Sequence, residues 1–76
     1  MTIIYIVEGE HFSVPGTNMR AFTSEDAATR YAAELCNIIL ANIGRPAVAT
    51  WENWQDSLPE SAVGCNVWLT PLELGP

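Results

Sequence analysis

The sequence predicts an α+β domain: a small antiparallel sheet of about three strands packed on one long helix, with a second short helix. β-Branched segments near both ends of the chain indicate the strands, and an amphipathic segment between them, closed by Gly44 and Pro46, indicates the long helix. The 76 residues are 49% hydrophobic, which is typical of a globular chain. We therefore expect residues 1–76 to form a single domain around one core.

The predicted strands lie at residues 2–8, 19–22 and 65–70. The first reads TIIYIVE and has apolar side chains on both faces, a pattern typical of a central strand that is covered on both sides. The polar segment SVPGTN at 13–18 predicts a loop, so the first two strands should form a hairpin. Pro71 ends the last predicted strand, although the tail after it can continue the sheet edge.

The long helix is predicted over residues 24–43. Thr23 can cap its first turn, with Asp26 as the acidic half of a capping box, and Gly44 can end it. Asp26 and Arg30 stand four residues apart and should pair on the solvated face. At 100° per residue, the apolar side gathers Ala28, Tyr31, Ala32, Leu35, Ile38, Ile39 and Ile43, and the opposite side gathers Asp26, Arg30, Glu34, Asn37 and, as its one large aliphatic residue, Leu40.

The segment TWENWQDSLPES, residues 50–61, contains two tryptophans among three carboxylates. Strand alternation would place Trp51 and Trp54 on opposite faces, whereas a short helix capped by Thr50 and ended before Pro59 places them on the same side. The helix is therefore favoured, and both tryptophans are expected to be buried against the sheet or the long helix. The acidic residues Glu52, Asp56 and Glu60 then remain on the outside.

The residue inventory offers little for catalysis. His11 is the one histidine, and no spacing joins it to Cys36 and Cys65 as a set of metal ligands. Both cysteines are expected to be buried thiols of the core. The glycines are scattered singly, so no phosphate-binding loop is predicted. We expect neither a metal nor a cofactor, and we expect that the protein is not an enzyme.

The charge balance restricts the partners. Nine carboxylates stand against three arginines and no lysine, which gives a formal net charge of −6. Nucleic acids and anionic lipids should therefore be repelled, and basic protein surfaces attracted. The first residues do not have the pattern of a secretion signal, so none is expected. The longest apolar stretch, residues 27–43, is interrupted by Arg30 and Glu34, so no membrane span and a cytoplasmic location are expected.

In size, acidity and strand-helix-strand order, the whole chain resembles the very small single-domain inhibitors that bacteriophages encode, above all the anti-CRISPR proteins. The resemblance rests on these three properties and on no shared motif. It implies a protein in the host-cell cytoplasm that occupies a basic, nucleic-acid-binding surface of a Cas effector, in some cases with carboxylates where phosphates would lie. From the residues themselves, we predict a partner-binding surface of Glu8, Glu10, Glu52, Asp56, Glu60 and Glu73, with Leu40 or Trp68 as its apolar anchor.

A homodimeric structural or regulatory module is the alternative function. One helix covers only one face of a three-stranded sheet, so the face that carries Ile4, Ile6 and Trp68 could be buried against a second copy. The short helix with Trp51 and Trp54 could cover that face instead. The molar mass in solution distinguishes these arrangements.

Overall fold

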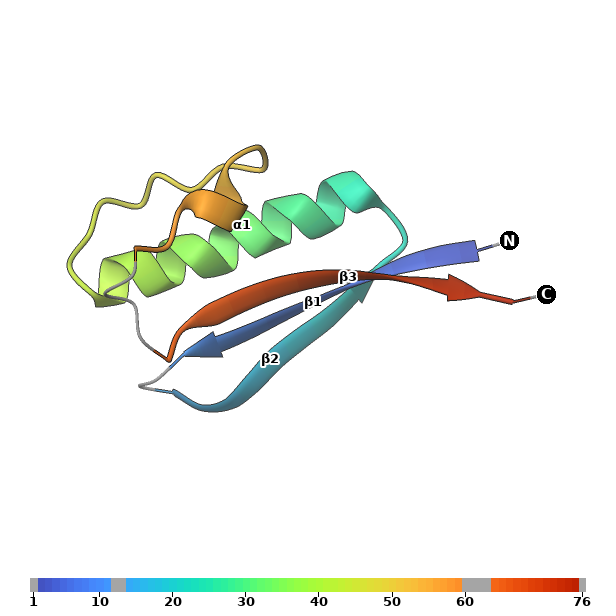
Figure 1. Cartoon of the computed structure of the whole chain (residues 1–76), viewed down its shortest axis with the longest axis horizontal. Coiled ribbons are helices and arrows are strands. Elements are labelled where there is room, and N and C mark those ends of the chain that lie inside the picture. The colour runs from blue at the N-terminus through green and yellow to red at the C-terminus, as the bar shows by residue number, and fades with distance from the viewer. Residues whose placement is uncertain (1, 12–13, 60–63, 76) are drawn as a thin grey trace.

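The chain folds as a three-stranded antiparallel sheet with one long helix on one of its faces (Figure 1). The computed structural model describes residues 2–11, 14–59 and 64–75, and for residues 11 and 14–18 it describes the backbone alone. The strand order is β2-β1-β3, so the connection through the helix passes over the central strand. The predicted α+β class is confirmed. The elements are β1 (Thr2–His11), β2 (Val14–Phe22), α1 (Glu25–Asn42), the 3₁₀ turn η1 (Trp54–Asp56) and β3 (Asn66–Leu74).

All three strands are longer than the sequence predicts. β1 continues to His11, and β2 begins at Val14, inside the segment that was predicted to be a loop. β3 continues through Pro71 to Leu74. Both outer strands lie at the edges of the sheet, where a proline costs no ladder hydrogen bond on its open side, and pairing with β1 overrides the local turn preference.

Alternate residues of β1 face α1. Val7 is fully buried, and a Cβ atom added to Gly9 would lie 2.8 Å from Cδ1 of Leu35, which places both positions on the helix side. The even-numbered residues of β1 therefore point to the other side of the sheet. Residues directly opposite one another on paired antiparallel strands share a face, so the pairing register assigns the faces of β2 and β3 as well.

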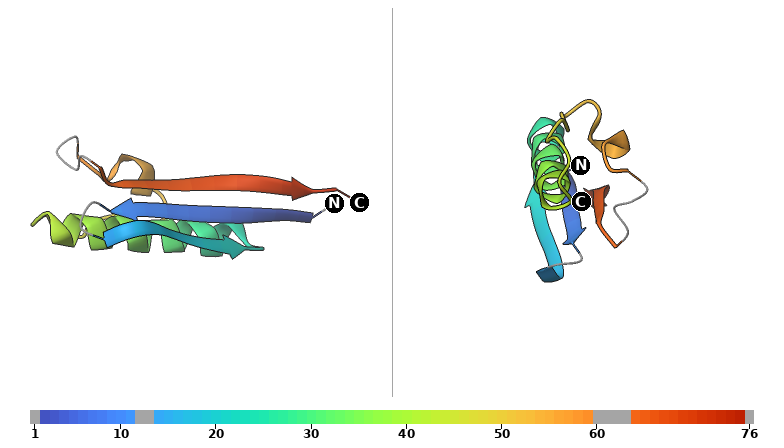
Figure 2. Two further views of the ribbon diagram at one scale, coloured as in Figure 1. Left: turned by 90° about the horizontal axis from the view of Figure 1, so that it is seen from below. Right: turned by 90° about the vertical axis from the view of Figure 1, so that its left-hand side faces the viewer.

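The core lies between α1 and the helix side of the sheet. Small residues of α1 allow the helix to approach the strands closely, and Figure 2 shows α1 lying along one side of the sheet. No described element covers the opposite side, so β1 is central as predicted but is covered on one face alone. The main buried cluster contains Val7, Ala28, Ala32, Ala33, Leu35, Cys36, Leu40, Ala49 and Trp54.

The ends of α1 are set by local signals. Ser24 is the N-cap (φ −116°, ψ 128°), and its side chain accepts a hydrogen bond of 3.3 Å from the backbone N–H of Ala27. The predicted cap at Thr23 is wrong by one residue, because Ser24 has the extended backbone that a cap requires. Gly44 follows the helix with φ +77°, a conformation that glycine adopts without strain, and this predicted stop is confirmed.

After the helix, the chain runs back along α1 and then, from η1, turns again toward the C-terminal end of the helix, and we call residues 45–59 the return segment (Figure 1). The side chain of Asn37 holds this segment with two hydrogen bonds to the backbone of Ala49, at 2.8 and 3.0 Å. Leu40, predicted to lie outside, is therefore 2% exposed, while Ile38, predicted to lie in the core, is 50% exposed. Both predictions are wrong. The two side chains point in nearly opposite directions, about 200° apart around the helix. The return segment covers the flank of α1 that carries Leu40, and the flank that carries Ile38 stays open to solvent.

The first residues of β1 and the last residues of β3 extend beyond the rest of the fold. β2 ends at Phe22, opposite Tyr5, so Thr2–Ile4 pair with Leu72–Leu74 alone. Figure 1 shows these two strand ends passing beyond the start of α1. The molecule is consequently elongated, with extents of 45 × 26 × 15 Å.

Candidate functional site

The predicted short helix is a single 3₁₀ turn, η1, and a tight turn precedes it. The Oγ1 atom of Thr50 accepts a hydrogen bond of 3.3 Å from the N–H of Asn53, and the Oδ1 atom of Asn53 accepts one of 2.7 Å from the N–H of Thr50. The N–H of Trp54 donates to the carbonyl of Thr50 at 3.0 Å. This reciprocal bonding fixes the turn from which both tryptophans project.

The two tryptophans occupy different environments. Trp54 is 6% exposed and packs in the main core, as predicted, and its carbonyl accepts a hydrogen bond from Sγ of Cys36 at 3.4 Å. Trp51 is 51% exposed, so its predicted burial is wrong. Because Ala49 is bonded to the helix on one side and Trp54 fills the space against α1 on the other, the indole of Trp51 is left at the surface.

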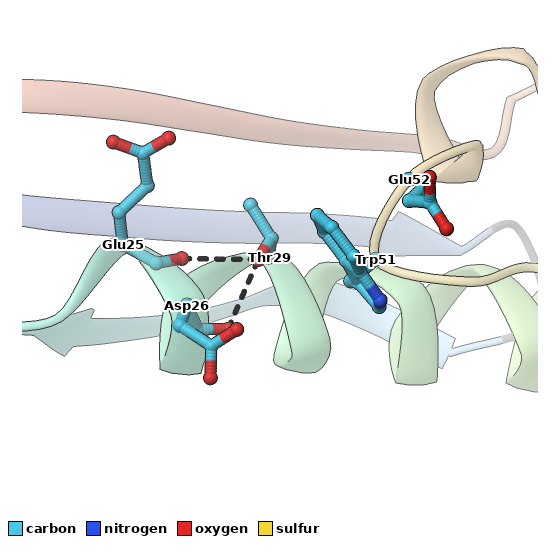
Figure 3. A pocket seen from close by; sticks show the side chains of 5 residues that line it. All are labelled: Glu25, Asp26, Thr29, Trp51 and Glu52. Atoms are coloured by element: carbon cyan, nitrogen blue, oxygen red, sulfur yellow. Dashed lines mark hydrogen bonds between the residues drawn. The ribbon is translucent and has the colours of Figure 1, made fainter.

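Trp51 lies in an open groove of about 500 Å³ over the first turns of α1, which we call the Trp51 groove (Figure 3). A smaller hollow of about 220 Å³ shares some of these residues and adds Trp54 and Leu69, so it extends the groove toward the helix side of β3. The groove is lined by Glu25, Asp26, Thr29, Trp51 and Glu52.

Three carboxylates line the groove together with the exposed indole, and they are not equivalent. Asp26 accepts a hydrogen bond of 2.9 Å from Nε of Arg30, the predicted pair on the solvated face of α1. Among the described residues, no cation lies within ion-pair distance of Glu25 or Glu52. The start of α1 contributes only about half of a positive charge. The groove therefore keeps an excess of negative charge.

The hydroxyl of Thr29 is occupied within the helix. It donates to the backbone carbonyls of Glu25, at 3.0 Å, and Asp26, at 2.9 Å, as the dashed lines in Figure 3 show. The polar groups that remain for a ligand are therefore carboxylate oxygens, which accept hydrogen bonds and do not donate them when ionised.

An indole face beside carboxylates favours an organic cation. A guanidinium or ammonium group over tryptophan gains about 0.5 to 2 kcal/mol from the cation–π interaction, depending on how far it is desolvated. A planar guanidinium can also donate two parallel hydrogen bonds to one carboxylate. Of the two common cations in proteins, arginine therefore fits the groove better than lysine.

The predicted partner-binding residues do not form one surface. Glu52 lines the Trp51 groove, whereas Asp56 lines a separate hollow beside Arg45 and Val48. Leu40 lies beneath the return segment and cannot serve as the predicted anchor, because its side chain is buried.

The remaining predicted residues lie on the sheet or outside the description. Glu8, Glu10 and Trp68 lie together on the side of the sheet away from α1. Glu73 lies on the helix side of the extending strand end, opposite Ile3 in the register. Glu60 lies outside the described residues.

The contribution of the start of α1 to the groove could not be predicted from the sequence. Glu25 and Asp26 read as ordinary first-turn acids that favour the positive end of the helix dipole, and Trp51 read as a core residue. The groove joins two acids to an indole that is some 25 residues later in the chain, and only the return segment brings them together. The one local signal was the neighbouring pair Trp51 and Glu52.

Both cysteines are buried and unpaired, which confirms them as core thiols. Burial raises the pKa of the Cys36 thiol, and a hydrogen bond from the side chain of Ser57 opposes that shift in part. Among the described residues, no three His, Cys, Asp or Glu side chains converge as metal ligands do. The side chain of His11 lies outside the described part.

Comparisons with protein-family models, with curated proteins and with solved structures find no match to this chain. Within the described residues, no helix combines the length and the apolar character needed to cross a bilayer. What the protein binds must therefore be inferred from its own surface.

Proposed function

We propose that the protein is a non-enzymatic inhibitor that binds a basic protein surface, with an arginine side chain of the target held in the Trp51 groove. The target that we propose is a nucleic-acid-handling complex, most specifically a CRISPR-Cas effector in the cytoplasm of the host cell. The single observation that supports this proposal is that the half-exposed indole of Trp51 shares one open groove with the carboxylates of Glu25, Asp26 and Glu52.

The charge of the whole chain supports a basic partner. With a net charge of −6 and no lysine, the protein is attracted to the arginine-rich surfaces with which proteins hold phosphates. Carboxylates that occupy such a surface compete directly with nucleic acid. The resemblance in size, acidity and element order to phage-encoded inhibitors points to the same class of target.

The residues of the groove have separate roles in this proposal. Glu25 and Glu52 attract the partner and orient it, and electrostatic complementarity of this kind acts mainly on the association rate. Trp51 contacts the bound cation at short range, and loss of such a contact acts mainly on the dissociation rate. Their substitutions should therefore have different kinetic effects.

The test measures binding kinetics and nuclease inhibition against a panel of purified CRISPR effectors. Glu52→Lys should slow association and flatten its salt dependence, whereas Trp51→Ala should raise the dissociation rate by about 2- to 30-fold, which corresponds to the range of cation–π energies. Glu34→Lys is the matched control, because Glu34 is exposed on α1, outside the groove, and the substitution changes the net charge by the same amount.

Two results would contradict the proposal. If no effector is bound or inhibited, the proposed target is wrong. If Glu34→Lys slows association as much as Glu52→Lys does, the effect comes from net charge, and the Trp51 groove is not the binding site. Asp56→Lys, in a separate hollow, shows whether the wider acidic surface contributes.

A homodimeric module is the second candidate function. The observation that favours it is the side of the sheet with Ile4, Ile6 and Trp68, which no described element covers. The molar mass from analytical ultracentrifugation tests it: a dimer that Trp68→Ala dissociates would support this function, and a monomer at high concentration would exclude it.

A further inference from the structure

The side of the sheet away from α1 carries apolar side chains that remain in contact with solvent. We call it the outer sheet face and define it by Ile4, Ile6, Glu8, Met19, Trp68 and Leu72. Met19 is 62% exposed, and Trp68 and Leu72 are each 43% exposed. A group of large apolar residues of this kind on one face is typical of a protein-binding surface.

The outer sheet face has an apolar end and an acidic end. Ile4 lies opposite Leu72, toward the chain termini. Glu8 lies directly opposite Met19 on one neighbouring strand and Trp68 on the other, so its carboxylate stands in a row between two exposed apolar side chains. Glu10 follows two residues later on the same face.

The cations of the chain lie elsewhere. The guanidinium of Arg20 is on the helix side of the sheet, 5.3 Å from the ring centre of Phe22 and 5.5 Å from that of Tyr31. Arg30 pairs with Asp26 on α1, and Arg45 follows the helix, so all three arginines are accounted for and the chain has no lysine. The outer sheet face of a second copy would therefore bring no arginine or lysine to Glu8.

A carboxylate that is buried at an interface without a cation is strongly unfavourable. Two copies packed face to face would bury Glu8 in this way, and their net charges of −6 would repel each other. A partner that combines apolar residues with arginine or lysine avoids both costs. The charge pattern of the face therefore favours a basic partner over a second copy.

The dimensions of the face match one helix. From Thr2 to Glu10, β1 spans roughly 27 to 30 Å. The sheet is three strands wide from Tyr5 onward, roughly 10 Å between the outer axes, and two strands wide before it. An α-helix is about 10 to 12 Å across with its side chains, and 18 residues of it extend about 27 Å. α1 itself has 18 residues and lies along the opposite face (Figure 2).

We propose that the outer sheet face binds an amphipathic, basic α-helix of a partner protein, of about four to five turns. The apolar side of that helix packs on Ile4, Ile6, Trp68 and Leu72, and arginine or lysine residues near one of its ends pair with Glu8 and Glu10. The bound helix completes a three-layer arrangement, with α1 on one face of the sheet and the partner on the other. This interaction does not require the Trp51 groove, which lies on the helix side of the sheet.

The test uses a fluorescently labelled 18-residue helical peptide with leucines at helical spacing and two arginines at one end. A control peptide carries glutamates in place of the arginines. Fluorescence anisotropy should show binding of the arginine peptide alone. Trp68→Ala should weaken that binding by roughly tenfold or more, as expected for a central aromatic contact, and Trp51→Ala should leave it within about twofold, because Trp51 is not on this face.

A charge reversal gives the sharpest result. The double variant Glu8→Lys and Glu10→Lys should bind the glutamate peptide and reject the arginine peptide. If Trp68→Ala impairs folding, Met19→Lys, at the more exposed end of the same row, gives the second measurement. Circular dichroism of each variant confirms that the domain is folded.

Three outcomes would overturn this inference. The first is that neither peptide binds, and the second is that both bind equally, which would mean that the carboxylates do not select the partner. The third is a dimer in the ultracentrifuge that Trp68→Ala dissociates, because a second copy would then occupy the face. Failure of Trp51→Ala to affect effector binding would contradict the proposed function and leave this inference intact.

Discussion

Truncation of Leu40 tests most directly whether the return segment buries one flank of α1. Leu40 and Ile38 lie on nearly opposite flanks of α1, and the helical pattern alone assigns Ile38 to the core and Leu40 to the surface. In the structure Leu40 is 2% exposed and Ile38 is 50% exposed. Leu40→Ala and Ile38→Ala are therefore a matched pair. The helical pattern predicts the larger loss of stability for Ile38→Ala, and the folded structure predicts it for Leu40→Ala.

The magnitudes follow from burial. Truncation of a buried leucine to alanine lowers the free energy of unfolding by about 2 to 5 kcal/mol. Ile38 is half exposed, so Ile38→Ala loses roughly 1 kcal/mol of burial energy, and the better helix propensity of alanine offsets up to about 0.5 kcal/mol of that loss. The expected change for Ile38→Ala is therefore below about 1 kcal/mol.

The assay is urea unfolding followed by far-UV circular dichroism, with a thermal melt as a second measurement. For a domain of this size, each kcal/mol shifts the melting temperature by about 4 to 8 °C, so Leu40→Ala should lower it by roughly 8 to 40 °C. If this variant is too unstable to fold, Leu40→Met is the milder change, with an expected loss below about 1.5 kcal/mol.

A loss below 1 kcal/mol for Leu40→Ala, or a larger loss for Ile38→Ala than for Leu40→Ala, would refute the reasoning. Either result would mean that the return segment does not cover this flank of α1, and the position of Trp51 over the helix would be wrong with it.

Three further predictions follow from the same contacts. Asn37→Ala should lower the free energy of unfolding in urea by about 1 to 3 kcal/mol, because two backbone groups of the return segment lose their partner; an unchanged midpoint would contradict this. Burial raises the pKa of the Cys36 thiol, so the stabilisation from its burial is complete well below the pKa of the unfolded thiol, about 8.5, and stability should fall as the pH rises through and above that value, by at most about 1.4 kcal/mol per unit; Cys36→Ala should remove this dependence. Acrylamide should quench Trp51 and Trp68 and spare Trp54, so Trp51→Phe and Trp68→Phe should each lower the quenchable fraction, and a similar loss in Trp54→Phe would count against its burial.

The fold class could be predicted because its signals are local. The apolar repeat and the stop at Gly44 define α1, and the β-branched run after Thr2 defines the central strand. The strand ends could not be predicted. Pro71 predicts the end of the last strand, and the sequence leaves open whether the sheet edge continues beyond it. β3 passes through Pro71 because pairing with β1 over nine residues outweighs a local preference.

The candidate site could be predicted only in part. The sequence indicated that Glu52, Glu8 and Trp68 belong to partner-binding surfaces, but it placed them on one surface with Leu40 as a possible anchor. The structure separates Glu52 from Glu8 and Trp68 by placing them on different sides of the sheet. Faces of a sheet depend on strand pairing, which links residues far apart in the chain, and no local pattern reports it.

The charge of −6, the absence of lysine, the small α+β class and the position of the long helix can all be read from the amino-acid sequence. The burial of Leu40, the exposure of Trp51 and the position of Trp51 beside the first turn of α1 depend on how the folded chain packs. A hydrophobic repeat specifies one buried side of a helix against one neighbouring layer. When a second segment packs on another flank, as residues 45–59 do on α1, burial is set by that contact, and the repeat carries no information about it.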